Sequence, residues 1–442
     1  MLPEKSKLKP LVLSSDFKYA LDLMENSDQS LFITGRAGTG KSTLLTLFRN
    51  QTRKKIVVLA PTGIAALNVK GQTIHSFFAF PPKVIQKDDI RKYSKRKKKY
   101  KSIDAIVIDE ISMVRADLLD GIDLFLRVNR EDPAPFGGVQ MIFFGDLFQL
   151  PPVVSRPAEK QFFSTYYKTP YFFSSMVIEN QFPVEMIELD KVYRQDEKHF
   201  IRLLDAIRMR TLDFEDLEDL NIRHQPEFGV RSSYITLCSV NAIADQINNS
   251  NLRELTTPEY KYQADMTGDF KISLFPTQQF LTLKEGAQVM LLRNDPQKRF
   301  VNGSIALVIL LDEETVKLRL VGGDHEGEEI ELDKIEWEML KYEYNEQSEK
   351  KLEAKVIGTF KQYPVKMAWA ITIHKSQGKT FDRVIIDLGR GAFEYGQTYV
   401  ALSRCRTLDG IVLKRALKFS DILVDDRIVE FYDGMRRYLP GG

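Results

Sequence analysis

The sequence predicts an α/β protein of two sheet-and-helix halves, with a small all-β unit inserted in the second half. Two observations indicate this fold class. Short apolar runs alternate with helical patterns in both halves, whereas residues 262–358 change to short strands separated by turn residues. Of the 442 residues, 43% are hydrophobic and 28% are charged. This composition is typical of a soluble globular protein, and the length is enough for more than one core.

The first half contains four apolar runs of the length expected for buried parallel strands. They are LFIT at 31–34, KKIVVLA at 54–60, DAIVID at 104–109 and VQMIFFG at 139–145. Helical periodicity is found between them, as in KSTLLTLFRN and RADLLDGIDLFLRVNR. Strands that alternate with helices in this way predict a doubly wound sheet over roughly residues 1–175.

The second half repeats the alternation around an insertion. Its strands and helices are expected at SSYITLCS, NAIADQINNSNLREL, DRVIIDL and GQTYVALSRCR. Between them, short strands joined by Gly, Asn and Asp turns are expected in QFLTLKEGAQVMLLRN, GSIALVILLD, TVKLRLVGG and EEIELDKIEWEML. This pattern predicts a small antiparallel barrel.

Composition argues against several classes of protein. The longest strong apolar run, IALVILL at 305–311, has the length of a strand rather than of a membrane span. The N-terminal MLPEKSKLKPLVLSS lacks the apolar core of a secretory signal. The two cysteines, Cys238 and Cys405, and the five histidines show no metal-ligand spacing, so no zinc site is expected. We therefore predict a cytoplasmic protein with no membrane partner.

Charge is unevenly distributed, although the net charge is only +2. From Lys87 to Lys101, nine Lys and Arg residues face two Asp residues, and residues 312–353 are strongly acidic. A solvated helix or loop is the commoner explanation for such a basic run, and contact with a polyanion such as DNA is the alternative.

A glycine-rich loop follows the first strand. GRAGTGKS at 35–42 matches G-x-x-x-x-G-K-S between a strand and a helix. Backbone N–H groups of such a loop surround phosphate oxygens, while Lys41 would reach the β- and γ-phosphates and Ser42 would bind Mg²⁺. The residues expected to contact the nucleotide here are Gly38, Thr39, Gly40, Lys41, Ser42 and Thr43.

The segment DAIVIDE at 104–110 supplies the matching acidic residues. Asp109 is placed to hold Mg²⁺, and Glu110 is placed to orient or deprotonate an attacking water. The Asp-Glu pair favours hydrolysis over transfer to a small acceptor, and no N-K-x-D sequence that would read guanine occurs. The chain is therefore predicted to hydrolyse a nucleoside triphosphate.

Further polar candidates follow other strands and helices. GDLFQLPPV at 145–153 ends a strand with Gly-Asp and presents Gln149, while Arg194 and Arg404 lie in VYRQDEKHF and YVALSRCRT. Thr62 and Gly63 begin a helix that could hold a phosphodiester. His75 fits either a buried structural histidine or a contact with single-stranded nucleic acid. A last polar cluster consists of His374, Lys375, Ser376, Gln377 and Gly378.

These segments occur in one order that resembles the superfamily 1B helicases of the petite-integration-frequency (Pif) type, with RecD-type helicases as cousins. The resemblance spans about residues 15–415 and rests on GRAGTGKS, APTGIAA, TIHSFF, IDEISMV, GDLFQLPPV, VYRQDEKHF, ITIHKSQGKTFDRV and YVALSR. The length is similar to that of a minimal prokaryotic or phage member.

The resemblance implies two RecA-like P-loop motor domains with ATP and Mg²⁺ in the cleft between them. It assigns 1–69 and 101–178 to the first motor domain, 70–100 to a wedge, 179–261 and 359–442 to the second motor domain, and 262–358 to an inserted SH3-like β-barrel. It also implies 5′→3′ movement on single-stranded DNA, with unwinding of duplexes and forks in DNA replication, repair, recombination and telomere maintenance. Whether G-quadruplex DNA and RNA–DNA hybrids are also partners is left open. The active form is expected to be a monomer.

Residue roles follow from the same resemblance. Gln149 would sense the γ-phosphate, Arg194 and Arg404 would reach it from the second domain, and Gly378 would lie near the nucleotide. The residues that would face DNA are Thr62, Gly63, His75, His374, Lys375, Ser376 and Gln377. One departure is Phe17 in LSSDFKYAL, where the family often has a glutamine that reads adenine. The base preference of the nucleotide site is therefore left open.

Three alternatives remain at this point. A P-loop kinase of a small molecule would leave the motifs after residue 360 unexplained. A nucleic-acid binding module could use ATP only as a clamp, without unwinding. Within the resemblance, a RecD-like repair subunit is the nearest alternative.

Overall fold

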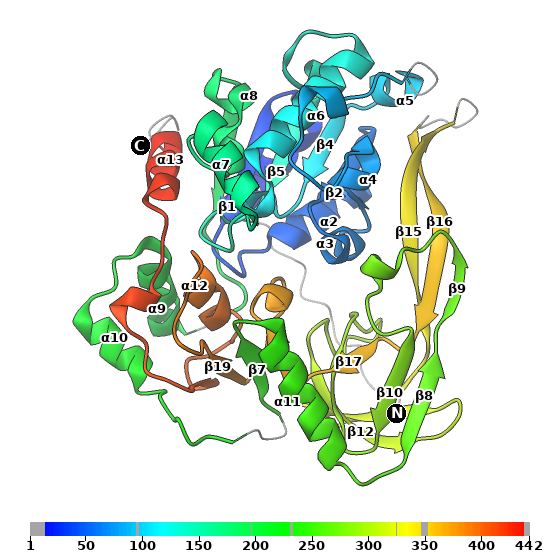
Figure 1. The fold of residues 1–442 in the computed structure, drawn as a ribbon, viewed down its shortest axis with the longest axis vertical. Coiled ribbons are helices and arrows are strands. Elements are labelled where there is room, and N and C mark those ends of the chain that lie inside the picture. Colours follow the sequence, from blue (N-terminus) through cyan, green and yellow to red (C-terminus); the bar gives the residue numbers. More distant parts are fainter. Residues whose placement is uncertain are drawn as a thin grey trace, which may run out of the picture.

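The structure is a computed structural model that describes residues 14–93, 97–195, 197–229, 233–323, 325–345 and 352–436. Figure 1 shows an upper sheet-and-helix unit, a second such unit at lower left, and an all-β unit at lower right. Within the described part of the chain, no helix is long and apolar enough to cross a membrane.

The first unit contains a six-stranded parallel sheet with strand order β3-β2-β4-β5-β1-β6. Its central strands are buried along their whole length because helices cover both faces. The strands are β1 (Ser30–Gly35), β2 (Ile56–Ala60), β3 (Gln72–Thr73), β4 (Ala105–Ile108), β5 (Gln140–Phe144) and β6 (Val184–Leu189). The helices are α1 (Ser15–Asn26), α2 (Lys41–Gln51), α3 (Gly63–Asn68), α4 (Ile74–Phe78), α5 (Lys97–Lys101), α6 (Ala116–Arg130), α7 (Pro157–Tyr166) and α8 (Met176–Glu179).

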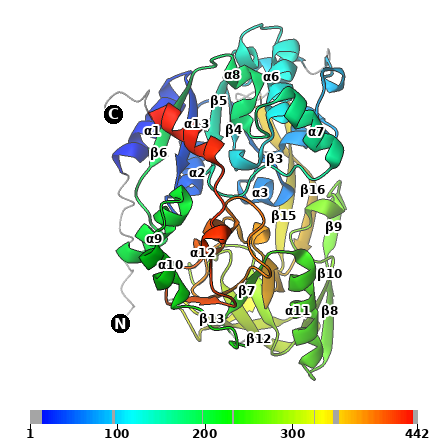
Figure 2. The same ribbon diagram turned by 60° about the vertical axis from the view of Figure 1, so that its left-hand side comes forward.

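The second unit has a four-stranded parallel sheet with order β18-β7-β19-β20. Its strands are β7 (Ile235–Cys238), β18 (Ala370–Thr372), β19 (Val384–Asp387) and β20 (Ile411–Leu413). Its helices are α9 (Lys198–Met209), α10 (Phe214–Asn221), α11 (Asn241–Glu254), α12 (Gln397–Leu402) and α13 (Asp426–Arg436). In Figure 2, α13 returns to the first unit beside β6, and the Phe431 ring stacks on Phe173 with centroids 4.4 Å apart.

The inserted unit is antiparallel, as the sequence predicts. Its main sheet has the order β14-β13-β12-β11-β17, and β8 pairs with β10. A third sheet, β15-β16-β9, contains a long hairpin. The strands are β8 (Glu259–Gln263), β9 (Asp265–Gly268), β10 (Phe280–Lys284), β11 (Gln288–Leu291), β12 (Ile305–Leu311), β13 (Val316–Val321), β14 (Glu329–Leu332), β15 (Ile335–Tyr344), β16 (Leu352–Gln362) and β17 (Val365–Met367).

The β15–β16 hairpin joins the inserted unit to the first unit, and it rises along the right-hand side of Figure 1. The hydroxyl of Tyr342 accepts a hydrogen bond from the N–H of Val58 at 3.1 Å. The N–H of Tyr342 donates to the side chain of Gln72 at 3.4 Å. The Tyr342 ring also meets Phe77 edge to face, with centroids 6.0 Å apart.

Two stretches lie differently from the boundaries expected for the motor domains. Val184–Leu189 was expected in the second motor domain, but it completes the first sheet by pairing with all six residues of β1. Within 70–100, expected to be a wedge, β3 pairs with β2, and Phe77 and Phe78 pack in the core of the first unit. The first difference arises from the pairing of two strands far apart in the sequence, and the second from the pairing of β3 with the neighbouring β2 and from core contacts of Phe77 and Phe78.

Candidate active site

The glycine-rich loop connects β1 to α2. Gly38 and Gly40 have φ angles of +86° and +87°, which favour glycine. A Cβ at Gly38 would lie 2.6 Å from the Cβ of Arg194, so a side chain would also have no space there. The loop conformation that exposes backbone N–H groups therefore depends on both glycines.

Lys41 is held over this loop by backbone carbonyl groups. Its Nζ donates to the carbonyl oxygens of Gly35 at 2.6 Å and Arg36 at 2.9 Å. Burial lowers the pKa of Lys41, and the negative charges of Asp146 and Glu110 oppose that shift. A phosphate group would offer this ammonium a full negative charge in place of two carbonyl dipoles.

Asp109 and Glu110 follow β4 and are both partly buried. Burial, followed by the charge of Glu110, raises the pKa of Asp109 to about 7. Burial also raises the pKa of Glu110, against the positive charges of Lys41 and Arg404. Glu110 has a φ of +51°, an unusual conformation for a residue with a side chain and one that is often found at functional sites.

These residues fit a magnesium ion. In the described residues no group of three or more His, Cys, Asp or Glu residues could hold a metal by itself. Mg²⁺ commonly takes only one or two protein oxygens and completes its shell with phosphate and water. The Asp109 carboxyl and the Ser42 hydroxyl supply that kind of oxygen beside the phosphate-binding loop.

Gln149 belongs to a buried polar network centred on Asp146. Gln149 donates to Asp146 at 3.3 Å, and the hydroxyl of Tyr399 on α12 donates to the same carboxylate at 3.2 Å. Arg208 on α9 donates to Asp146 at 3.3 Å, and the Tyr399 hydroxyl accepts from the N–H of Ala37 at 2.9 Å. Asp146, Arg208 and Tyr399 were missed by the sequence analysis, although the Gly-Asp that ends β5 was a signal for the first of them.

Arg194 and Arg404 meet at Ser403. Arg194 donates to the carbonyl of Ser403 at 3.1 Å, and Arg404 donates to its hydroxyl at 2.8 Å. Burial, followed by the charge of Arg404, lowers the pKa of Arg194 to about 9. Burial also lowers the pKa of Arg404, which is only 1% exposed. The buried Arg404 and the partly buried Arg194, beside the loop of Gly38 and the carboxyl of Glu110, provide a place for a highly charged anion.

The residues predicted to face DNA lie in separate places. Thr62 caps α3, where its side chain accepts from the N–H of Ala65 at 3.2 Å. A Cβ at Gly63 would lie 2.0 Å from the side chain of Leu274 in η6 (Ile272–Leu274), so this segment of the inserted unit packs against Gly63, while Thr62 stays exposed. His75 lies on α4, and burial lowers its pKa, with Arg115 adding to the effect and Asp117 opposing it.

The other predicted DNA residues surround η7 (His374–Ser376). His374 is paired with Glu394 at 3.0 Å, and the buried Ser376 donates to the carbonyl of Ile373 at 2.6 Å. Lys375 is exposed. Within the described chain, the Nε2 of Gln377 is buried without a hydrogen-bond partner.

Gly378 and the loop residues Thr39 and Thr43 can be placed as well. Gly378 is exposed and has a φ of +73°. Thr39 is fully buried and donates to the carbonyl of Arg36 at 3.0 Å. Thr43 is exposed on the first turn of α2.

Phe17 packs against the glycine-rich loop. It is 4% exposed, and a Cβ at Gly40 would lie 2.9 Å from its ring. Its ring meets Tyr193 edge to face, with centroids 6.3 Å apart. An apolar ring offers no hydrogen bond to a base, so the role of Phe17 is to pack against the glycine-rich loop and Tyr193.

The basic run has structural partners where it is described. Lys97 and Lys101 on α5 pair with Glu131, the second of them at 3.2 Å. The Nζ of Lys99 lies 4.3 Å from the centre of the Phe77 ring. Residues 94–96 of the run lie outside the described residues.

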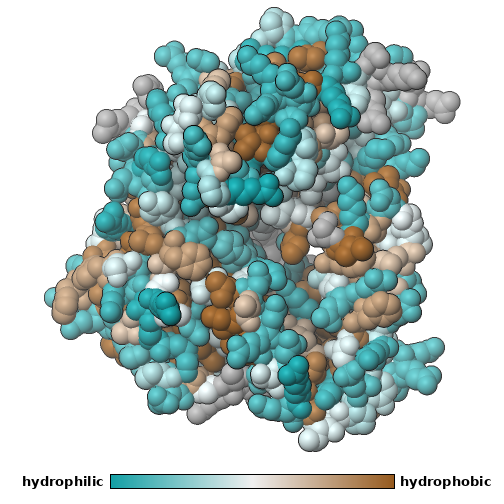
Figure 3. All heavy atoms as spheres, viewed as in Figure 1, coloured by the Kyte–Doolittle hydropathy of each residue, from teal (hydrophilic) through white to brown (hydrophobic). Residues whose placement is uncertain are grey.

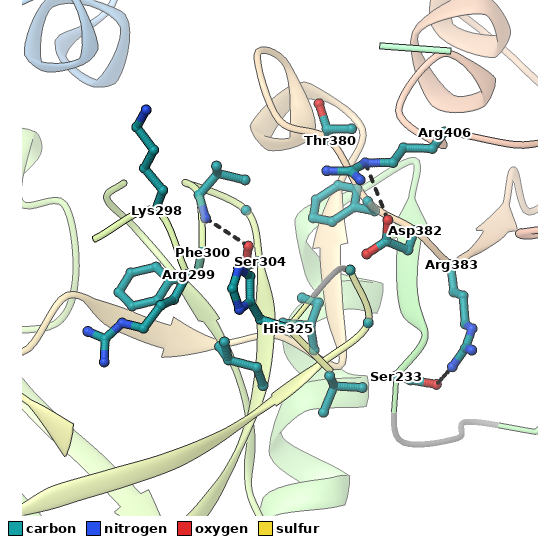
Figure 4. A pocket seen from close by; sticks show the side chains of 18 residues that line it. Ser233, Lys298, Arg299, Phe300, Ser304, His325, Thr380, Asp382, Arg383 and Arg406 are labelled. Atoms are coloured by element: carbon teal, nitrogen blue, oxygen red, sulfur yellow. Dashed lines mark hydrogen bonds and ion pairs between the residues drawn. The ribbon is translucent and has the colours of Figure 1, made fainter. Parts of the chain in front are cut away.

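Figure 4 shows a cavity of about 140 Å³ between the inserted unit and the second unit. Two of its cationic side chains have polar partners: Arg406 pairs with Asp382 at 3.3 Å, and Arg383 donates to Ser233 at 3.0 Å. None of the predicted site residues lines this cavity.

Figure 3 shows the face of Figure 1 as mainly hydrophilic, with scattered hydrophobic patches and a hollow near its centre.

Comparison with known proteins places this geometry in a family. A family model described as PIF1-like helicase matches residues 13–217, and one described as DNA helicase Pif1, 2B domain, matches residues 269–311. The human ATP-dependent DNA helicase PIF1 is 34% identical over 427 residues, which cover 92% of this chain and 62% of the human one. The Campylobacter jejuni ATP-dependent DNA helicase Pif1 is 30% identical, covering 91% of this chain and 94% of the relative.

Solved structures agree with this assignment. Bacteroides sp Pif1 in complex with ADP-AlF4 has a TM-score of 0.89 at 34% identity, covering 97% of this chain and 98% of that one. Bacteroides Pif1 bound to ssDNA has a TM-score of 0.68 at 35% identity with the same coverage. The parallel-sheet core of the first unit and that of the second are therefore shared with this group of structures.

Proposed function

This chain belongs to the PIF1-like helicase family, and on that premise we propose that it is an ATP-dependent DNA helicase that moves 5′→3′ on single-stranded DNA. The chain spans about three fifths of the length of the human relative. The observation that carries the proposal is the pair of arginines, Arg404 buried and Arg194 partly buried, beside the glycine-rich loop. Arg194 and Arg404 face a site that already contains Lys41 and the Asp109–Glu110 pair.

ATP hydrolysis follows from the charges in this cleft. Lys41 holds the phosphates, and Glu110 accepts a proton from the attacking water, for which its raised pKa is suited. Arg194 and Arg404 neutralise charge on the transferred phosphoryl group, and arginines in this role contribute roughly 10³–10⁵ to the rate in other systems. Gln149 is proposed to sense the γ-phosphate through its link to Asp146.

Ser42 and Asp109 would hold Mg²⁺, which neutralises phosphate charge when bound. For this role the Asp109 carboxyl must be ionised, and its pKa of about 7 makes the charged form sensitive to pH near neutrality. Thr39, Thr43 and Gly378 are proposed to line the same nucleotide site.

Coupling to movement would use the polar network that links the two units. Asp146 of the first unit contacts Arg208 and Tyr399 of the second unit. Loss of the γ-phosphate would therefore change contacts in both units. If each unit holds the DNA backbone in turn, one cycle of hydrolysis produces one step along the strand. Backbone contacts of this kind make binding sensitive to salt and largely independent of sequence.

The proposed partners are single-stranded DNA and single-strand/duplex junctions, with G-quadruplex DNA and RNA–DNA hybrids as further substrates to test. A Bacteroides relative was solved bound to ssDNA, and another structure describes unwinding at forked dsDNA by two coordinating Pif1 helicases. For this chain we propose an active monomer that works in the cytoplasm. The lower similarity to the ssDNA-bound relative supports a rearrangement of the units when DNA binds.

The test of the nucleotide site is ATP hydrolysis with and without single-stranded DNA. We expect a strong increase in rate when an oligonucleotide is added. A flat response would refute the translocase and favour a P-loop kinase. Stimulated hydrolysis without strand separation would favour the ATP-dependent clamp.

A further inference from the structure

We propose that Gln195 is a positioning residue that holds Arg194 and Arg404 in place for ATP hydrolysis. The inference rests on the proposed function, and it adds a residue that the sequence analysis did not single out. Gln195 follows Arg194 in the segment that connects β6 to α9. Its side chain is only 2% exposed, so the polar atoms depend on partners inside the protein.

The amide of Gln195 joins this segment to the residues that follow α12. Its Nε2 donates to the carbonyl oxygens of Ser403 at 3.2 Å and Cys405 at 2.9 Å. These two residues stand on either side of Arg404 in the chain. A side chain adjacent to Arg194 therefore holds the backbone that carries Arg404.

The backbone around Ser403 determines where the Arg404 guanidinium lies. Arg404 donates to the carbonyl oxygen of Val400 at 2.9 Å and to the hydroxyl of Ser403 at 2.8 Å. Arg194 donates to the carbonyl oxygen of Ser403 at 3.1 Å. A phosphate would compete for the Arg194 guanidinium, because a charged acceptor binds it more strongly than a carbonyl group does. The amide of Gln195 would keep the two segments joined after Arg194 turns to the phosphate.

The segment 193–195 also lies against the glycine-rich loop. The N–H of Tyr193 donates to the carbonyl oxygen of Gly38 at 2.9 Å. The Oε1 of Gln195 lies 3.4 Å from the place that a Cβ on Gly38 would take. The segment is therefore packed between the phosphate-binding loop and the end of α12, and both arginines are placed relative to that loop.

These contacts fix the orientation of the Gln195 amide. Turning the amide over would bring Oε1 against the carbonyl oxygens of Ser403 and Cys405, and none of these atoms can donate. In the part of the chain that the structure describes, Oε1 is buried without a hydrogen-bond partner. A buried acceptor of this kind costs free energy, which an apolar side chain that only filled the space would avoid. The role of Gln195 therefore lies in the hydrogen bonds of its Nε2.

The experiment measures how tightly the full chain binds a fluorescent ADP with and without aluminium fluoride, in the presence of Mg²⁺ and an oligo-dT. Aluminium fluoride and ADP together mimic the transition state, so groups that act on the transferred phosphoryl group strengthen this complex more than that of ADP alone. Gln195→Met removes the two hydrogen bonds at similar volume. We expect the affinity for ADP to stay within about twofold, and the strengthening by aluminium fluoride to fall about tenfold.

Steady-state hydrolysis gives a readout that a purely structural role would not produce. Gln195→Met should lower kcat about ten- to hundredfold with little change in the KM for ATP, because the two arginines act in the transition state. In an Arg194→Ala background the same substitution should cost a smaller factor, since a positioning residue cannot misplace a group that is absent. Equal factors in the two backgrounds would show that Gln195 acts independently of Arg194.

The matched control is Gln288→Met in the inserted unit. Gln288 on β11 is also fully buried, and its Nε2 donates to the carbonyl oxygens of Tyr234 at 2.7 Å and Ala368 at 2.8 Å. The control therefore loses the same kind of hydrogen bonds away from the nucleotide site, and thermal unfolding compares the stability of the two variants. Wild-type kcat and wild-type strengthening by aluminium fluoride are expected for Gln288→Met.

A Gln195→Met variant with the kcat of the wild type and its full response to aluminium fluoride would overturn the positioning role while leaving the proposed function intact. Losses of the same size in Gln288→Met would overturn it as well, because general damage to the fold would then explain them. If the wild-type chain does not hydrolyse ATP, the proposed function fails and the positioning role with it.

Discussion

Asp109 and Glu110 are adjacent in the chain, and burial raises the pKa of both carboxyl groups. These residues were predicted from sequence because a phosphate-binding loop and an Asp-Glu at a strand end are local patterns. Asp146, Arg208 and Tyr399 could not be predicted in the same way, since Arg208 lies 62 residues and Tyr399 lies 253 residues from Asp146. Only the folded chain brings such side chains together.

Glu110→Gln should retain nucleotide binding and lose turnover, because the amide cannot accept a proton from water. General-base catalysis contributes typically about 10²–10⁴ to the rate, so we expect a fall of that order in DNA-stimulated ATP hydrolysis. Asp104→Asn, at the other end of the same strand and exposed, is the matched control. Rapid hydrolysis by Glu110→Gln would show that another group activates the water.

Asp109→Asn should stabilise the fold at high pH while it abolishes hydrolysis. The pKa of Asp109 is about 7 in the folded chain against an ordinary value of 3.8, so between these values the folded chain binds more protons than the unfolded chain. Stability therefore falls as the pH rises through this interval. Thermal unfolding should give Asp109→Asn a higher Tm than the wild type at about pH 8, with the difference shrinking toward about pH 4. A lower Tm for the variant at the higher pH would mean that Asp109 is stabilised by a partner.

At the scale of elements, the strands that hold the glycine-rich loop and the acidic pair were predicted well, because buried parallel strands have continuous apolar sequences. The placement of β6 was not predicted, since the sequence VEMIEL does not indicate which sheet the strand joins. The docking of the β15–β16 hairpin on the first unit was also missed. It depends on Tyr342 reaching Val58, and no local pattern encodes that contact.

The contact between η6 and α3 affects DNA binding if Thr62 and Gly63 hold a phosphodiester. Leu274 packs against Gly63, so DNA must displace this side chain before it can contact the backbone of Gly63. Leu274→Ala removes apolar contact worth about 1 kcal/mol and should tighten binding of single-stranded DNA about fivefold. The control is Ile272→Ala in the same segment, which is 79% exposed and should change the affinity little. Anisotropy with a labelled oligonucleotide measures both, and weaker binding by Leu274→Ala would mean that η6 contributes to the DNA site.

At the scale of the whole molecule, the first and second units both contribute residues to the nucleotide site, and both also contribute predicted DNA-binding residues. Ala37 of the glycine-rich loop donates to Tyr399 of the second unit at 2.9 Å, so the loop is linked directly to the second unit. The inserted unit contacts the first unit through Tyr342 and Leu274. Motion of any unit therefore changes contacts in the others, which a motor that steps along DNA requires.

The most direct test of the helicase assignment is strand displacement on two partial duplexes that differ only in the polarity of their single-stranded tail. We predict that ATP drives separation of the strands when the tail is 5′ and that the 3′-tailed duplex stays paired. Separation of the 3′-tailed duplex alone, or of neither duplex under conditions in which single-stranded DNA stimulates hydrolysis, would contradict the account.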